Sequence, residues 1–378
     1  MKNVVIAGFA RSPFHFASKG KLARIRPDDL ASQVVNGLLK KTGVDPNEIE
    51  DIILGCAFPE GEQGFNIAKL VGMLSELPQS VAGTTINRFC GSSMQAIHMA
   101  AGAIQMDAGH AFIAGGIESM SRVPMLGFNP MPNPKLAESN PGAYMPMGIT
   151  AENLAMKFQF TREAQEAFAV ESHRKAAAAQ ESGRFDDEIV AIETPDGVVD
   201  KDGCIRADTS AESLKALKAA FLAEGTVTAG TASPLTDGSS ATLVTSEEFA
   251  RAHGLPVLAR IKSIAVSGCD PTIMGYGPVP STEKALKRAG ITVKDLDIVE
   301  SNEAFAVQAM SVAQALGFDG AKVNLDGGAL ALGHPLGATG ARITGKAAQL
   351  LKREGGQFAL STQCIGGGQG IATVLEAV

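Results

Sequence analysis

The segment DDLASQVVNGLLKKTGVDPNEIEDIILG, residues 28–55, decides the fold because its plan occurs a second time in the chain. Apolar residues at helical spacing lead to Gly43, and a short acidic connection then leads to an apolar run that is typical of a strand. The segment STEKALKRAGITVKDLDIVES, residues 281–301, repeats the helix, the glycine stop at Gly290, the acidic connection and the strand. The two glycines lie 247 residues apart, so an internal repeat is predicted.

A second pair of segments has the same spacing. AAGAIQMDAGHAFIAGG and AAQLLKREGGQFALSTQ, which begin at residues 100 and 347, each predict a helix that ends at a glycine and then a buried strand. Their glycines, Gly109 and Gly356, are again 247 residues apart. The strands are continuous apolar runs, which indicates that helices cover both of their faces. Two matches at one offset predict two copies of one αβ unit, in the α/β class, with the active site between them.

The repeat divides the chain into three parts. Residues 1–119, completed by 236–257, are predicted to form the first half, and residues 258–378 form the second half. Residues 120–235 belong to neither copy, because a stretch rich in Pro, Gly and Asn precedes a strongly helical one. We expect this part to be an inserted loop or lid domain.

The composition narrows the class of protein. The chain has 378 residues, a formal net charge of −7, no tryptophan and no basic cluster, which argues against a nucleic-acid partner. It has no apolar run near the roughly 18 to 20 residues of a membrane span and no signal-peptide pattern, so we expect a cytoplasmic protein. The five cysteines form no CxxC pair, which favours a reducing compartment. No two of the six histidines have metal-ligand spacing, so no metal site is predicted.

Cys90 stands where a strand-like run gives way to a helical one, in TTINRFCGSSMQAIHMAAGAI, residues 84–104. At such a turn, the free N–H groups of the first helical turn and the helix dipole favour a thiolate, the reactive form of cysteine. A free cysteine is also a common small core residue. This segment alone leaves both interpretations open.

His334 lies in GGALALGHPLGATG, residues 327–340, where a proline follows it and glycines surround it. The repeat offset places it opposite Asn87, three residues before Cys90, so the His334 turn is paired with the Cys90 turn. This is an argument from sequence for a Cys–His pair. The alternative is a loop histidine that is hydrogen-bonded for structural reasons.

Two further segments carry candidate polar groups. In STQCIGGGQG, Cys364 ends a strand and three glycines follow, whose backbone N–H groups are free to hold an oxyanion. The pattern is not a GxGxxG that opens a helix, which argues against a nucleotide site. In VESNEAFAVQA, Asn302 and Glu303 end a strand, and capping of the next helix is the alternative to a chemical role for Asn302.

Taken together and in this order, these segments resemble the thiolase family, and within it the 3-ketoacyl-CoA thiolases. The resemblance runs nearly end to end, and it rests on NRFCGSSMQAIH, GGIESMSRVPM, VTAGTASPLTDGSSA, GCDPTIMGYGPVP, NEAFAVQ, GGALALGHPLGATGARI and CIGGGQG. It implies a thiolase fold in which duplicated halves form a five-layered αβαβα sandwich with an inserted loop domain. It also implies assembly into a homodimer or homotetramer.

The resemblance implies an activity as well: thiolytic cleavage of 3-ketoacyl-CoA by CoA to acyl-CoA and acetyl-CoA through an acyl-cysteine, in fatty-acid β-oxidation. Coenzyme A is then a substrate, and no tightly bound cofactor is expected. Cys90 matches the family's nucleophile, His334 its base, and Cys364 the general acid that later acts as base on CoA. Asn302 would hold a water that, with His334, stabilises the enolate oxygen. The backbone N–H groups of Cys90 and Gly366 would hold the tetrahedral oxyanion.

Ligand contacts carry over in the same way. Arg206, Ser213 and Ser233 match family contacts to the nucleotide and pantetheine parts of CoA. The alternative for Arg206 and Ser213 is that they are solvated helix residues. The positions that line the acyl and pantetheine pocket match Met147, Met274 and Phe305. The alternative for these three is that they are ordinary core residues.

The main alternative is a biosynthetic acetyl-CoA acetyltransferase. Relatives of that type usually carry a histidine in an HMG segment, where this chain has Pro146 in PMGITAE, and this weakens the short-chain interpretation. A catalytically silent acyl-CoA carrier would lack the reactive residues, and a condensing enzyme that uses carrier protein would lack the cysteine of CIGGG. The resemblance leaves open the chain length, the direction in the cell, and association with a β-oxidation hydratase or dehydrogenase subunit.

Overall fold

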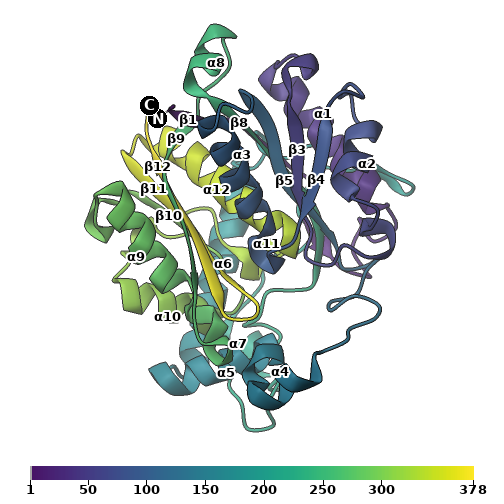
Figure 1. Cartoon of the computed structure of the whole chain (residues 1–378). Helices are drawn as coiled ribbons and strands as arrows, with labels where there is room; N and C mark the ends of the chain where they lie inside the picture. The colour runs from purple at the N-terminus through teal and green to yellow at the C-terminus, as the bar shows by residue number, and fades with distance from the viewer. Residues whose placement is uncertain (1) are drawn as a thin grey trace.

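The computed structural model describes residues 2–378. Figure 1 shows two groups of strands with helices between and outside them. The strands are β1 Val4–Arg11, β2 His15–Phe16, β3 Asp51–Gly55, β4 Ala82–Ile86, β5 Ala111–Ser119, β6 Ile192–Thr194, β7 Gly197–Val199, β8 Thr236–Ser246, β9 Ala259–Gly268, β10 Ile298–Ser301, β11 Phe358–Ile365 and β12 Gln369–Glu376. The helices are α1 Pro27–Thr42, α2 Ile67–Leu74, α3 Ser92–Gln105, α4 Pro134–Ser139, α5 Met147–Phe158, α6 Arg162–Glu181, α7 Ala211–Lys215, α8 Glu247–Ala252, α9 Pro278–Ala289, α10 Ala306–Leu316, α11 Ala329–Leu332 and α12 Leu336–Glu354.

The main strands follow the order β10-β11-β12-β9-β1-β8-β5-β3-β4. Strands β1, β3, β4 and β5 belong to the first half together with β8, which returns from the insertion and pairs with β1 and β5. The two halves meet edge to edge where Val5 pairs with Arg260 and Ile6 pairs with Ala259. Each half contributes its own mixed set of strands, called here the first and the second sheet, and this short joint links the two sets into one continuous sheet.

Helices form the remaining layers. Helices α1 and α2 pack on the first sheet, and α9 packs on β9 and β12 of the second sheet with α10 beside it. Helices α3 and α12 pack on each other and contact strands of both sheets, so they form the central layer (Figure 1). The predicted five-layered αβαβα sandwich is therefore confirmed.

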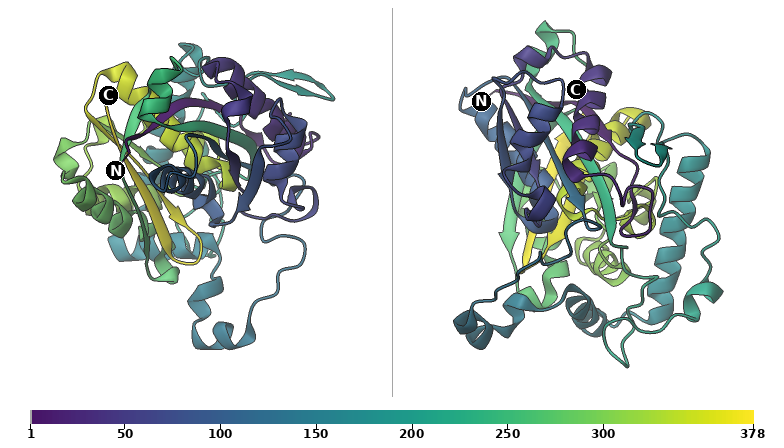
Figure 2. Two further views of the ribbon diagram at one scale, coloured as in Figure 1. Left: turned by 45° about the horizontal axis from the view of Figure 1, so that its top comes forward. Right: turned by 90° about the vertical axis from the view of Figure 1, so that its right-hand side faces the viewer.

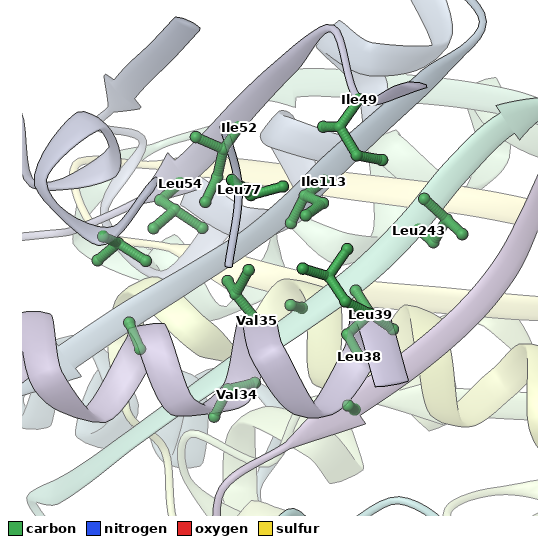
Figure 3. Close-up of a cluster of buried hydrophobic side chains, with 14 of the residues drawn as sticks. Val34, Val35, Leu38, Leu39, Ile49, Ile52, Leu54, Leu77, Ile113 and Leu243 are labelled. Carbon is green, nitrogen blue, oxygen red and sulfur yellow. The ribbon is translucent and has the colours of Figure 1, made fainter. Parts of the chain in front are cut away.

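The largest apolar cluster lies between α1 and the first sheet (Figure 3). The apolar face of the amphipathic helix α1 and the apolar strands explain this cluster, because both present their large side chains to the space between helix and sheet. Full burial of each such side chain contributes roughly 1.5 to 3 kcal/mol of transfer free energy. The cluster includes Val34, Val35, Leu38, Leu39, Ile49, Ile52, Leu54, Leu77, Ile113 and Leu243.

The glycine stops of α1 and α9 agree with the repeat. Gly43 has φ 69° and Gly290 has φ 72°, a left-handed conformation that glycine adopts at helix ends without steric cost. The predicted stop at Gly109 is wrong, because α3 ends at Gln105 and the Met106 N–H returns to the last turn. The corresponding helix of the second copy, α12, ends at Glu354 and is followed by Gly355, which has φ 73°.

The copies also differ at the edge of the first sheet. Strand β4 has its counterpart, at the repeat offset, in the short helix α11, which packs against α6 of the insertion. The chain therefore reaches Asn87 from a strand but reaches His334 from a helix. This difference gives the two paired turns different surroundings.

Residues 120–235 contact both halves. Ile189 bridges to Arg11, the last residue of β1, and Gln33 of α1 exchanges hydrogen bonds with the backbone of Glu193 in β6. Helix α6 packs on α10 and α11 of the second half. Figure 2 shows the segment around α4 projecting from the body of the molecule. The division at residues 120 and 235 stays a prediction.

No helix within residues 2–378 is long and apolar enough to span a bilayer. In the same residues, no three histidine, cysteine or acidic side chains are grouped as metal ligands would be.

The contact between α3 and α12 depends on Gly340. A Cβ at Gly340 would overlap the backbone nitrogen of Met94 and lie 2.7 Å from its Cβ. We expect Gly340→Ala to lower the free energy of unfolding by about 1 to 3 kcal/mol, as overpacking does. In the control Gly102→Ala, at an exposed position of α3, a Cβ would meet nothing within 4 Å. That change should be neutral or stabilising by up to about 1 kcal/mol. Urea denaturation of both variants measures the difference, and equal effects would contradict the close contact.

Candidate active site

Cys90 sits in a single 3-10 turn, Phe89–Gly91, between β4 and α3. Phe89 has φ 44°, which is unusual for a residue with a side chain and costs on the order of 1 to 3 kcal/mol. Two side chains stabilise the turn: Asn87 Oδ1 accepts from the Phe89 N–H at 2.8 Å, and Ser92 Oγ donates to the Phe89 carbonyl at 2.6 Å. The strained turn is thus held from both sides.

Two backbone N–H groups, those of Gly366 and of Cys90 itself, act on the Cys90 sulfur to lower the pKa of the thiol. Burial is the larger effect, and with a contribution from the charge of Glu118 it raises this pKa to about 11. Desolvation of the sulfur outweighs the dipoles around it, so the helix terminus alone does not leave Cys90 as a thiolate at rest. The thiol is neutral and needs a base.

His334 is buried, and burial together with the Arg342 cation lowers the pKa of its imidazole to about 3. Thr339 lies one helical turn into α12, and its Oγ1 donates to the Pro335 carbonyl at 2.9 Å. The same oxygen lies 2.7 Å from His334 Nδ1, so it accepts the Nδ1 proton. The hydrogen-bond network therefore assigns the neutral tautomer with an unprotonated Nε2, the form that can accept a proton.

Asn302 faces that nitrogen. Its Nδ2 lies 3.4 Å from His334 Nε2, and its Oδ1 is buried without a protein hydrogen-bond partner. It does not cap the following helix, because Phe305 is the N-cap of α10 and makes no side-chain cap bond. A buried amide oxygen with no partner is well suited to hold a water.

The Cys364 thiol lies close enough to Cys90 for the charge of one to affect the pKa of the other. It is fully buried, and burial followed by the nearby Cys90 charge raises the pKa of its thiol well above the ordinary value. The hairpin after it turns through Gly367 and Gly368, both at positive φ, and so presents the Gly366 N–H to Cys90. The two sulfur atoms thus share one environment although they come from different halves.

The residues expected to line the acyl pocket gather around Cys364. One apolar cluster contains Cys364, Met274 and Phe305, and Met147 packs against it. Ser233 belongs to the same region, because its N–H donates to the Ala304 carbonyl at 2.9 Å.

The other two residues expected to contact CoA lie on the surface of the insertion. Arg206 is exposed and stacks on Phe16, with its guanidinium carbon 5.1 Å from the ring centroid. The Ser213 hydroxyl forms a capping box with Ser210, which is a structural role of the kind weighed against CoA contact. The structure brings neither residue into the group around Cys364.

Three residues of the site were missed by the sequence reasoning. Thr339 fixes the imidazole, and the Gln363 amide donates to the Cys90 carbonyl across the two halves. Glu118 is a buried carboxylate in the otherwise apolar run AFIAGGIES. The sequence could have indicated Glu118, because it is an isolated charge in an apolar run. It could not have indicated Thr339 and Gln363, because their contacts depend on how the two halves meet.

The neutral thiol predicts how Cys90 reacts with iodoacetamide, since only the thiolate is alkylated. The rate should keep rising with pH beyond about pH 9, because the thiol pKa is raised to about 11. Mass spectrometry of the Cys90 peptide over a pH series measures it. In urea-denatured protein, the control, the rate should level near the roughly 8.5 of a free thiol. A plateau by about pH 7 in the native protein would contradict the neutral thiol.

Comparison with known proteins agrees with this geometry. Residues 4–248 match the model of the thiolase N-terminal domain, and residues 255–377 match that of the thiolase C-terminal domain. A 3-ketoacyl-CoA thiolase of Shewanella sp. (strain ANA-3) is 50% identical over 391 residues, covering all of both chains, and one of Marinobacter nauticus is 47% identical over 388 residues, covering all of this chain and 99% of the other. The crystal structure of human mitochondrial 3-ketoacyl-CoA thiolase in complex with CoA superimposes with a TM-score of 0.93 at 38% identity, covering 100% of this chain and 98% of the human one. This chain belongs to the thiolase family.

Proposed function

We propose that this protein is a 3-ketoacyl-CoA thiolase that cleaves a 3-ketoacyl-CoA with CoA to give acyl-CoA and acetyl-CoA. The observation that supports the proposal is the set of reactive groups that the two halves contribute. A neutral thiol with two N–H donors, Cys90, comes from the first half. A neutral imidazole with a free Nε2, His334, and a second thiol, Cys364, come from the other. Acyl transfer between thioesters needs these groups: a nucleophile, a base and a separate acid.

In the first half-reaction, the Cys90 sulfur attacks the 3-keto carbon while its proton passes to His334 Nε2. The carbonyl oxygen becomes an oxyanion, and the bond between carbons 2 and 3 then breaks. The electron pair of that bond leaves as the enolate of acetyl-CoA, whose oxygen is stabilised by His334 and by a water on Asn302 Oδ1. The Cys364 thiol gives its proton to carbon 2, so acetyl-CoA departs and Cys90 carries the acyl group.

In the second half-reaction, the Cys364 thiolate takes the proton of the incoming CoA thiol. The CoA sulfur attacks the acyl-Cys90 carbonyl, and the oxyanion lies between the N–H groups of Cys90 and Gly366. These two groups already lower the pKa of the Cys90 thiol in the resting protein, which supports their role. Each donor of this kind is typically worth about a hundredfold or more in rate. Collapse of the intermediate releases acyl-CoA, and the departing Cys90 sulfur takes back its proton from His334 Nε2.

For substrate binding, we propose that Met147, Met274 and Phe305 line the acyl and pantetheine pocket, because they pack with Cys364 in one cluster. Ser233 adjoins the same cluster through Ala304. Arg206 and Ser213 are proposed to reach the nucleotide part of CoA from the surface of the insertion, 120–235. Coenzyme A is a substrate in this scheme, and no tightly bound cofactor is required.

We also propose that the protein assembles as a homodimer or homotetramer and that it is cytoplasmic. Its proposed partner is a β-oxidation hydratase or dehydrogenase subunit. Strand β4 supports the assembly, since it pairs only with β3 and its other edge is free within the described residues. Nearby apolar side chains are exposed, including Phe65 at 92%, Met73 at 55% and Leu74 at 50%. Free sheet edges with apolar neighbours favour pairing with another chain.

The activity is tested by following acetyl-CoA released from acetoacetyl-CoA and from longer 3-ketoacyl-CoAs in the presence of CoA. We expect cleavage of the longer substrates and its loss, by about a thousandfold or more, in Cys90→Ser. Cys204→Ser, a buried thiol in the insertion, is the control and should keep activity. Folded protein without CoA-dependent cleavage would refute the proposal. Activity confined to the four-carbon substrate would favour the biosynthetic acetyltransferase.

A second variant tests the tautomer of His334. In Thr339→Val the acceptor of the Nδ1 proton is lost, so the imidazole can hold its proton on Nε2, where it cannot act as base. We expect kcat to fall by about 10- to 100-fold, as for other partners that orient a histidine. Thr42→Val is the control, because the Thr42 hydroxyl also donates to a carbonyl one turn back in its helix but contacts no histidine. Equal kcat in both variants would contradict the role of Thr339.

A further inference from the structure

Glu118, the residue before the last in β5, is a charged group at 1% exposure with no cation among its partners in residues 2–378. Both carboxylate oxygens instead face hydrogen-bond donors, an arrangement that fits the ionised form. Burial raises the pKa of this carboxyl, and the donors act in the opposite direction. The donors are the Ala57 N–H at 2.8 Å, the Gly337 N–H at 2.9 Å, Gln63 Nε2 at 3.0 Å, the Phe58 N–H at 3.3 Å and the Cys56 thiol at 3.7 Å.

The Ala57 peptide links Glu118 to the turn that carries Cys90. Its N–H binds the carboxylate, and its carbonyl accepts from Asn87 Nδ2 at 2.9 Å. The Oδ1 of the same Asn87 holds the N–H of Phe89, the strained residue before the cysteine. A continuous chain of hydrogen bonds therefore runs from Glu118 to the nucleophile's turn.

The Gly337 N–H links Glu118 to the other half. Gly337 is in the first turn of α12, and this helix has no side-chain cap of its own. A carboxylate at a helix N-terminus satisfies a free N–H and interacts favourably with the helix dipole. The close approach requires glycine here, because a Cβ at Gly337 would lie 2.6 Å from the Ile117 carbonyl oxygen. His334 lies three residues before this contact, in the turn that leads into the helix.

We propose that Glu118 is a positioning residue of the thiolase reaction, whose carboxylate sets the spacing between the Cys90 turn and the His334 turn by binding backbone N–H groups from both halves. The proposal rests on the function proposed above. This role explains why a carboxylate without a cation partner lies buried among apolar residues. Burial of such a group lowers stability, and the positions that its hydrogen bonds set would account for its presence. Asn87 and His334 are equivalent in the repeat, so one carboxylate controls both of the paired turns.

Glu118 also acts on the Cys90 sulfur through its charge, which provides a readout that a purely structural role would not change. A negative charge disfavours the thiolate and so raises the thiol pKa. Removing the charge should move the pH profile of Cys90 alkylation to lower pH. Burial leaves two other titratable groups of the proposed site, His334 and Cys364, neutral in the resting protein.

Two variants separate position from charge. Glu118→Gln keeps the shape but loses the charge and turns an NH2 group toward the backbone donors. Glu118→Asp keeps the charge but shortens the reach. We expect kcat to fall by about a hundredfold in both, as a displacement near 1 Å can cause, with KM for acetoacetyl-CoA changed by less than about threefold. Only Glu118→Gln should shift the alkylation profile to lower pH.

The control is Glu62→Gln, a partly exposed carboxylate that pairs with Arg122 near the same segment. It should leave kcat and the alkylation profile unchanged. A kcat within about twofold of the unmodified protein in either Glu118 variant would overturn the proposal. So would an unshifted alkylation profile in folded Glu118→Gln, with folding checked by circular dichroism. If Glu118→Gln does not fold, kcat of Glu118→Asp decides.

The alkylation profile distinguishes this proposal from the activity itself. A shift in Glu118→Gln without any 3-ketoacyl-CoA cleavage by the unmodified protein would refute the proposed function and leave the link between Glu118 and Cys90 in place. Cleavage by the unmodified protein with normal kcat in the variants would refute only the positioning role.

Discussion

The packing of α3 against α12 is the contact on which the site depends. Each helix begins directly after a functional turn: α3 follows Cys90, and α12 follows His334. Gly340 allows the two helices to approach, and the Ser93 hydroxyl accepts from the Ala341 N–H at 2.9 Å across the contact. Because both helices lie between two sheets, neither can move without disturbing a core on each side. The seam therefore fixes the relative positions of the turns that carry Cys90 and His334.

The burial that creates this seam also sets its chemistry. Desolvation raises the pKa of Cys90 to about 11 and lowers that of His334 to about 3, so the resting pair is neutral. In the proposed reaction, charge appears only as the reaction proceeds, when preorganised N–H groups would be in place to stabilise it. The assigned tautomer of His334 and the free Oδ1 of Asn302 belong to the same arrangement, since each is ready to accept a hydrogen bond.

Buried ion pairs join the insertion to both halves. Glu188 accepts from Arg11 of β1 at 2.7 Å and from Lys346 of α12 at 2.8 Å, and Lys346 also pairs with Asp326 at 2.8 Å. Removing one member would leave a buried charge without a partner, which typically costs about 3 to 5 kcal/mol. The insertion is thus part of the framework that holds α12, although its sequence bears no relation to the repeat.

The sequence by itself determined the duplicated architecture, because helix and strand periodicity and the glycine stops at Gly43 and Gly290 are local properties that recur at one offset. It also singled out the turns of Cys90, His334 and Cys364, whose glycines and prolines mark unusual backbone. Only the tertiary structure decided the protonation of these groups, the orientation of His334 by Thr339, and the place of Glu118 between the halves. These depend on desolvation and on donors brought from distant segments, which no local pattern records.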